Sequence, residues 1–152
     1  MPGGPFQVGE GAPHIRVTVG AIAAEASRLG ARILDDAEAP GLGAAIALGL
    51  AGIPADRPRA VLLGDLPALR PEDLAAALAA AAGVDLGTVR DADGEGTALV
   101  TAAPGVALEP RFGVGSAAAH LGAGFAPLPV REGSTRKRDV DTVEHLAEAA
   151  RL

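Results

Sequence analysis

The sequence predicts a single α/β domain, a three-layer sandwich in which a mainly parallel sheet lies between two layers of helices. Short runs of β-branched and apolar residues alternate with alanine-rich runs of helical length, which is the pattern of βαβ units. The length of 152 residues fits one domain, and 49% apolar residues against 21% charged residues exclude intrinsic disorder. We expect residues 1–13, rich in Gly and Pro, to be poorly ordered and residues 14–152 to form the domain.

The first half of the chain alternates predicted strands with predicted helices. The strands are short and rich in apolar residues, and they cover His14–Gly20, Ala31–Leu34 and Arg59–Gly64. The helices are alanine-rich runs that end close to a glycine, and they cover Ala21–Leu29 and Leu42–Leu50. Since Arg59–Gly64 is almost continuously apolar, we expect helices to cover both faces of this strand.

The second half of the chain repeats the alternation. A helix is predicted from Pro71, because proline is favoured in a first turn and because Glu72 and Asp73 complement the helix dipole there. The remaining predicted elements are the strands Val84–Val89 and Thr97–Ala102, a helix after Ser116, a β-like run over Ala126–Arg131 and a closing helix, Thr142–Leu152. Strands and helices at this spacing predict a largely parallel sheet.

The composition excludes several classes of function. The net charge is −6, Trp and Tyr are absent and there are only three Phe, so the chain lacks the basic patch and the stacking residues of nucleic-acid-binding proteins. No apolar run is long enough to cross a membrane, and the first residues do not form a signal peptide. Without cysteine there are no disulfides, so we expect a cytoplasmic protein. Lysine-dependent chemistry would have to use Lys137, the only lysine.

Three aspartates are the candidate catalytic and metal-binding residues. Asp65 follows a predicted strand, at the position where α/β sheets bind ligands, and a cap or turn residue is the alternative. Asp139 and Asp141 belong to an extended segment, so both carboxylates project to the same side. Two such carboxylates without Cys or a His pair favour Mg²⁺ or Mn²⁺. The alternative is that Asp141 caps the closing helix while Asp139 is solvated.

Two loops that contain glycine are candidate anion sites. One covers residues 93–97 and precedes a strand, and the other covers residues 111–116 and precedes a helix. Free backbone N–H groups, a hydroxyl and a helix N-terminus together suit a phosphate, although either loop alone is more often a plain turn. Together with the three aspartates, these loops indicate metal-assisted phosphoryl or nucleotidyl transfer.

The three histidines give weaker signals. His120 lies on the same helical face as Ser116 and could approach the site, but structural packing is the favoured interpretation. His14 and His145 occupy ordinary positions, at a strand edge and in a helix. None of them identifies a metal site or a catalytic base.

Four segments resemble the phosphoenolpyruvate/2-phospho-L-lactate guanylyltransferase family of coenzyme F420 biosynthesis. They are residues 62–74 (LLGDLPALRPEDL), 91–100 (DADGEGTALV), 108–120 (LEPRFGVGSAAAH) and 138–146 (RDVDTVEHL). They occur in order, within a resemblance that covers roughly residues 14–150, and PRFG-x-GS and DVDT are the most specific parts. The sequences of these segments are similar to those of actinobacterial members, which implies phosphoenolpyruvate as the acceptor.

The resemblance implies a nucleotide-diphospho-sugar-transferase (glycosyltransferase-A-like) fold. It also implies transfer of GMP from GTP to phosphoenolpyruvate, or to 2-phospho-L-lactate, with release of pyrophosphate. The residues that it implies as catalytic and as ligands of Mg²⁺ or Mn²⁺ are Asp65, Asp139 and Asp141. Those implied for the acceptor are Thr97, Gly113 and Ser116, and those implied for the nucleotide are Gly41, Gly43, Gly64 and Leu66.

The sequence departs from the family pattern in two places. Nothing before His14 resembles the strand, basic glycine-containing loop and helix with which the family begins. We therefore expect an N-terminally truncated version of the fold with weak or absent GTP turnover. Gly41-Leu42-Gly43 stands where the family has Gly-Leu-Asn, which removes an amide near the nucleotide. A sheet without its first strand has unpaired edges, which favours a homodimer.

Two alternative functions stay open. The first is a catalytically impaired remnant that binds a phospho-acid or a partner, and the three retained aspartates argue against it. The second is a nucleotidyltransferase for molybdenum cofactor or a sugar nucleotide, which shares the chemistry but explains the PRFG-x-GS segment less well.

Overall fold

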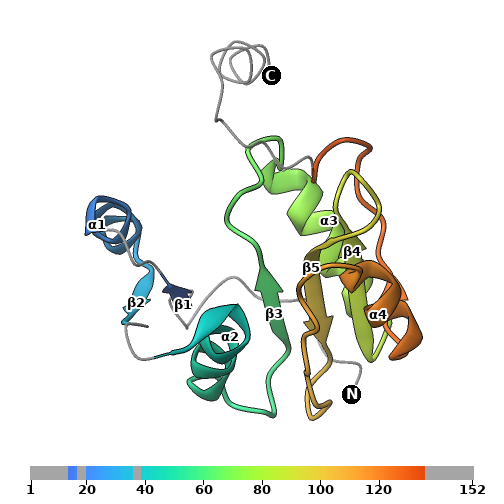
Figure 1. Cartoon of the computed structure of the whole chain (residues 1–152), viewed down its shortest axis with the longest axis horizontal. Helices are drawn as coiled ribbons and strands as arrows, with labels where there is room; N and C mark the ends of the chain where they lie inside the picture. Colours follow the sequence, from blue (N-terminus) through green and yellow to red (C-terminus); the bar gives the residue numbers. More distant parts are fainter. Residues whose placement is uncertain (1–13, 17–19, 36–38, 136–152) are drawn as a thin grey trace.

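A computed structural model of the chain describes residues 14–16, 20–35 and 39–135 (Figure 1). Strands and helices alternate along the chain, except that the fifth strand follows the fourth directly, and this order is the one that the sequence predicts. In chain order they are β1 (His14–Arg16), α1 (Gly20–Arg28), β2 (Arg32–Leu34), α2 (Gly41–Ala51), β3 (Arg59–Leu62), α3 (Pro71–Ala81), β4 (Leu86–Arg90), β5 (Thr97–Ala102), α4 (Ser116–Gly122) and β6 (Ala126–Pro127). In this described part, no helix has the length and apolar character needed to cross a membrane. The predicted segment 1–13 and the predicted closing helix lie outside it.

Two predicted strands are much shorter in the structure than in the prediction. The first predicted strand was expected to end at Gly20, but that residue begins α1. The β-like run over Ala126–Arg131 pairs only as β6. Its prolines, Pro127 and Pro129, explain the early end, because a proline has no N–H to donate to a neighbouring strand.

The main sheet is not mainly parallel, and this part of the predicted fold is wrong. Its strands lie in the order β3-β5-β4-β6, and β4 and β6 are parallel. β5 lies between β3 and β4 and runs antiparallel to both of them (Figure 1). β1 and β2 form a separate parallel pair. The connection between β4 and β5, residues 91–96, explains the difference, because a parallel crossover needs about a dozen residues or more. The chain therefore forms a mixed α/β structure.

Strand β5 lies at the centre of the core. All six of its residues are buried, and consecutive residues point to opposite faces of the sheet. Leu99 packs in a cluster with Ala77 and Ala81 of α3, whereas Val100 packs in a second cluster with Phe125. The sheet thus separates two apolar layers, and β5 contributes to both of them.

The helix α2 and the strand β3 expose more apolar surface than their sequences predict. Among the described residues β3 pairs with β5 only, and its Leu62 is 40% exposed. The helix α2, GLGAAIALGLA, has no polar side chain, yet Ala45 is its only buried residue, and Leu42 and Leu48 are exposed. A helix that is apolar on every side is typical of a buried position. The expectation that helices cover both faces of β3 is therefore not met by the described residues.

The hydroxyl of Thr88 is buried without a hydrogen-bond partner among the described residues, so its removal should change the stability of the fold. The residue is 1% exposed, and its Oγ1 forms no hydrogen bond within the described ranges. Valine keeps the shape of the side chain and removes the unpaired polar group. Thr88→Val should therefore raise the free energy of unfolding by about 1 kcal/mol, measured by urea denaturation.

Thr97→Val is the matched control for this measurement. Thr97 is 2% exposed, but its Oγ1 lies 2.8 Å from His120 Nδ1, within hydrogen-bond distance. The same substitution there leaves a buried partner unsatisfied, so the free energy of unfolding should fall by about 1–3 kcal/mol. A Thr88→Val variant destabilised to the same extent would show that the hydroxyl of Thr88 is not an unpaired group.

Candidate functional site

The candidate site lies at the edge of the main sheet where β3 and β4 end and β5 begins. The antiparallel register pairs both Leu62 of β3 and Val89 of β4 with Leu99 of β5. The loop after β3, the loop between β4 and β5, and Thr97 at the start of β5 are therefore at the same edge. This is the edge at which the sequence predicts Asp65.

Asp65 stands in an exposed position in the loop that follows β3. The alternative that it caps α3 is wrong, because the residue at the N-cap of that helix is Arg70. The next residue, Leu66, is 8% exposed and packs in the first core cluster, and its carbonyl oxygen accepts a hydrogen bond from the N–H of Leu69 (3.1 Å). The side chain of Leu66 thus anchors the loop, while Gly64 and Asp65 are exposed.

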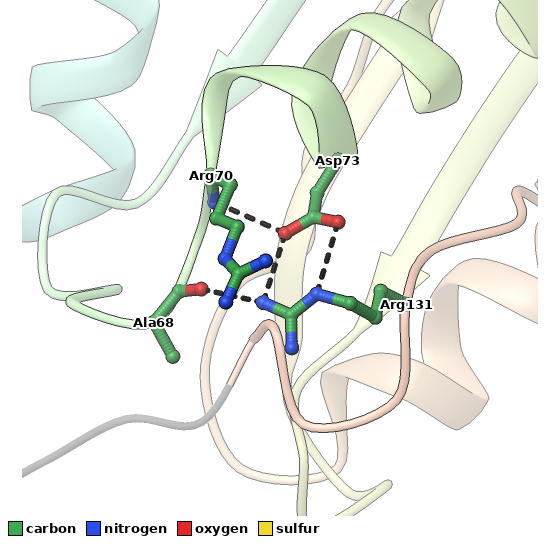
Figure 2. Close-up of polar contacts among 4 residues, drawn as sticks. All are labelled: Ala68, Arg70, Asp73 and Arg131. Carbon is green, nitrogen blue, oxygen red and sulfur yellow. Dashed lines mark hydrogen bonds and ion pairs between the residues drawn. The ribbon is translucent and has the colours of Figure 1, made fainter. Parts of the chain in front are cut away.

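An ion pair between Asp73 and Arg131 fixes the loop that carries Asp65 (Figure 2). The Arg131 guanidinium donates from Nε to Asp73 Oδ1 (3.2 Å) and from Nη2 to Asp73 Oδ2 (3.1 Å). The same Nη2 donates to the carbonyl oxygen of Ala68 (2.9 Å), and the backbone N–H of Arg70 donates to Asp73 Oδ2 (3.0 Å). The loop after β3 is thereby tied to the start of α3 and to the segment after β6.

The ion pair holds Asp73 in its charged form. The hydrogen bond from Arg131, followed by that from the backbone of Arg70, lowers the pKa of the Asp73 carboxyl. The sequence indicates half of this arrangement, because an acid in the first turn of a helix can bind the free N–H at its start. No local pattern identifies Arg131, which lies 58 residues further along the chain.

The structure brings the two predicted glycine loops together. The backbone N–H of Ala117, just after the second loop, donates to the carbonyl oxygen of Glu95 in the first (3.0 Å). Asp91 closes the first loop, since its Oδ1 accepts the N–H of Gly96 (3.1 Å). A Cβ at Gly96 would lie 2.2 Å from Asp91 Oδ2, so a larger residue there would displace the Asp91 carboxylate that closes the loop.

The second glycine loop presents free backbone N–H groups. Gly113 (φ 133°) and Gly115 (φ 70°) adopt backbone conformations that favour glycine. Gly113, Val114 and Gly115 are exposed, and within the part of the chain that the structure describes their N–H groups donate no hydrogen bond. Successive free N–H groups in a loop of this kind are typical of anion-binding sites.

Thr97 and Ser116, the predicted hydroxyl contacts of the acceptor, are buried beside this loop. Each is 2% exposed, and Thr97 Oγ1 shares a hydrogen bond with His120 Nδ1 (2.8 Å). Of the three predicted acceptor residues, Gly113 alone is exposed. Thr97, Gly113 and Ser116 therefore lie on adjoining elements, but of these three residues only Gly113, in the second glycine loop, faces solvent.

His120 is packed in the core, as the sequence favours, and its ring nitrogens also form hydrogen bonds. It is completely buried between Phe112 and Phe125, with ring centroids 5.7 Å and 4.9 Å away, and its Nε2 accepts the backbone N–H of Arg111 (2.8 Å). Burial is the main cause that lowers the pKa of His120, which the backbone of Ser116 opposes and the charge of Arg111 supports. The ring is consequently neutral at pH 7.

The predicted nucleotide residues lie on two separate elements. Gly64 and Leu66 lie in the loop after β3 at the sheet edge, whereas Gly41 and Gly43 lie in the first turn of α2. The three glycines are exposed. Within the described ranges, no backbone hydrogen bond of the loops joins Gly41 or Gly43 to that edge.

The predicted acidic pair, Asp139 and Asp141, lies outside the described residues. Thr135, the last residue of the described part, donates its hydroxyl to the carbonyl oxygen of Arg90 at the end of β4 (2.9 Å). In that part no group of three His, Asp or Glu could hold a metal ion. It includes Asp65 alone of the predicted ligands, and a carboxylate of this kind supplies the hard oxygen atoms that Mg²⁺ or Mn²⁺ prefers.

Comparison with known proteins relates the chain to enzymes named for guanylyl transfer. No family model matches it. Proteins named phosphoenolpyruvate guanylyltransferase are 47% identical over 86% of this chain in Thermomonospora curvata, 48% over 87% in Salinispora arenicola and 42% over 93% in Mycolicibacterium smegmatis. The predicted resemblance is thereby confirmed, and the chain is a homologue of the phosphoenolpyruvate guanylyltransferases. The chain spans 58%, 62% and 66% of the lengths of these three relatives.

Because Asp73 is ion-paired with Arg131, we expect its contribution to the stability of the fold to be lost at low pH. Because folding lowers the pKa of this carboxyl, its contribution is complete above the ordinary value of 3.8 and is lost as the pH falls through the lower folded value. Asp73→Asn should therefore lower the melting temperature by several degrees at pH 7, and the difference from wild type should shrink below about pH 4. Thermal unfolding followed by circular dichroism over this pH range measures both effects.

Glu72→Gln is the matched control, since Glu72 is the neighbouring acid in the same helical turn and is exposed. It should change the melting temperature little at any pH, because an exposed charge contributes little to stability. Equal losses in the two variants would mean that the helix dipole, and not Arg131, accounts for the effect of Asp73.

Proposed function

We propose that this chain provides the acceptor- and metal-binding part of an enzyme that transfers GMP from GTP to phosphoenolpyruvate, in coenzyme F420 biosynthesis. The observation that carries the proposal is the 42–48% identity to three proteins named phosphoenolpyruvate guanylyltransferase, over most of this chain. Those names favour this function over the remnant and molybdenum cofactor alternatives. The finer fold, a glycosyltransferase-A-like domain, is proposed on the same homology.

The second glycine loop supports binding of an anionic acceptor. Its free, exposed N–H groups at Gly113, Val114 and Gly115 would donate to the phosphate or carboxylate of phosphoenolpyruvate. Thr97 and Ser116 would line the same site from their buried positions on adjoining elements. Phosphoenolpyruvate is the proposed acceptor, and 2-phospho-L-lactate, with the same two anionic groups, is the second candidate.

Asp65, together with Asp139 and Asp141, would hold Mg²⁺ or Mn²⁺ through carboxylate oxygens. Such an ion would neutralise negative charge between the triphosphate and the acceptor. An oxygen of the acceptor phosphate would attack the α-phosphorus of GTP, and the bond from that phosphorus to the bridging oxygen would break as pyrophosphate leaves. No nucleophile from the protein is required, because the acceptor is already an anion.

Several narrower assignments remain proposals. The nucleotide would contact the exposed glycines Gly41, Gly43 and Gly64 and the backbone of Leu66. A homodimer is supported by the apolar surface that α2 and β3 leave uncovered in the described part. A cytoplasmic location remains a prediction from the absence of cysteine.

Calorimetric titration with phosphoenolpyruvate tests the proposed function. Binding should occur with Mg²⁺ and disappear in EDTA, because the anionic ligand would otherwise approach the aspartate carboxylates without a counter-charge. Asp65→Asn should weaken the Mg²⁺-dependent binding by about tenfold or more. A chain that binds no phosphoenolpyruvate at millimolar concentrations with Mg²⁺ present would contradict the proposal.

Asp56→Asn is the matched control for this titration. Asp56 is an exposed aspartate in the connection between α2 and β3, at the other end of the strand from Asp65. The substitution removes the same charge from the same protein, so it should leave the binding constant unchanged. An equal loss in both variants would show that overall charge, and not a ligand at Asp65, is responsible.

A further inference from the structure

The buried imidazole of His120 connects the two walls of the proposed acceptor site. One ring nitrogen, Nδ1, is bonded to Thr97 Oγ1 at the start of β5, and the other, Nε2, accepts the backbone N–H of Arg111 at the start of the second glycine loop, each at 2.8 Å. The side chain is 0% exposed, and Phe112 and Phe125 meet the ring in edge-on contacts. The ring therefore has no freedom to turn without losing both bonds.

The partner of Nε2 determines the state of the ring. A backbone N–H can only donate, so Nε2 must accept from Arg111 and must carry no proton. In a neutral ring the proton then lies on Nδ1, which donates to Thr97 Oγ1. Thr97 is thereby held as the acceptor of this bond, and its own hydrogen is left to donate elsewhere.

We propose that His120 is a positioning residue of the acceptor site, whose Nδ1-protonated ring sets both the orientation of the Thr97 hydroxyl and the start of the loop at Arg111. The inference rests on the proposed function. In the described part of the chain, the bond from the Ala117 N–H, at the start of α4, to the Glu95 carbonyl fixes the end of this loop. The His120 bond to Arg111 fixes the other end of that loop, ahead of the free N–H groups.

Two variants of His120 separate its hydrogen bonds from its bulk. His120→Phe keeps a ring between Phe112 and Phe125 but loses both hydrogen bonds, so affinity for phosphoenolpyruvate with Mg²⁺ should fall about tenfold or more. His120→Gln can place an amide oxygen near the position of Nε2 and accept from Arg111, so it should recover part of the affinity. Circular dichroism below the melting transition confirms that each variant is folded before titration.

Phe125→Leu is the matched control, because Phe125 packs on the same ring and makes no hydrogen bond to it. It should lower stability and leave affinity for phosphoenolpyruvate within about twofold of wild type. If His120→Phe binds as wild type does, or if Phe125→Leu loses the same affinity, the positioning role is wrong. If wild type itself binds no phosphoenolpyruvate, the proposed function fails first, and the inference that rests on it fails too.

The ring of the wild-type protein provides a readout that requires no variant. Two-dimensional ¹H–¹⁵N correlation spectra of histidine side chains distinguish a ring protonated at Nδ1 from one protonated at Nε2. The Nδ1-protonated form is expected for His120, together with slow hydrogen exchange of the Arg111 amide that becomes faster in His120→Phe. A ring protonated at Nε2 would overturn the inference, because it could not accept the bond from Arg111.

Discussion

The antiparallel pairing of β5 with both of its neighbours is the constraint on which the candidate site depends. It brings the start of β5 to the edge where β3 and β4 end, as the register of Leu62 and Val89 on Leu99 shows. If β5 ran parallel to β3, Thr97 would lie at the opposite edge from Asp65. Because all six residues of β5 are buried, the strand also gives Thr97 a fixed backbone position.

Side chains hold the loops at this edge in place where the backbone ladder of the sheet ends. Arg131 reaches across 58 residues to Asp73 and also binds the Ala68 carbonyl, so the loop that carries Asp65 cannot move independently of α3. His120 performs the same task for the second glycine loop through Arg111. The two arrangements differ in chemistry: the first depends on an ionised carboxylate and the second on a neutral ring.

The sequence predicts the elements well because their signals are local. Pro71 begins α3 and Thr97–Ala102 forms β5 as the pattern indicates, since the residue types of each segment decide its conformation. The direction of β5 was missed, although the short connection of residues 91–96 between two strands is a signal for antiparallel pairing. The pairings of Arg131 with Asp73 and of His120 with Thr97 could not be predicted, because these partners lie 58 and 23 residues apart and no spacing rule relates them. Asp139 and Asp141 stay predictions.

The sequences of α2 and β3 are typical of buried elements, yet the described part of the chain leaves several of their apolar side chains exposed. A strand with the sequence RAVLLG is expected between covered faces, and a helix without a polar side chain is expected in a core. Yet Leu62 of β3 and Leu42 and Leu48 of α2 are exposed, whereas all six residues of the central strand β5 are buried. Exposing such surface opposes stability, because apolar area is stabilising only when it is removed from water. The sequence of these two elements is therefore suited to a larger apolar contact on the side of the sheet that lies away from β5.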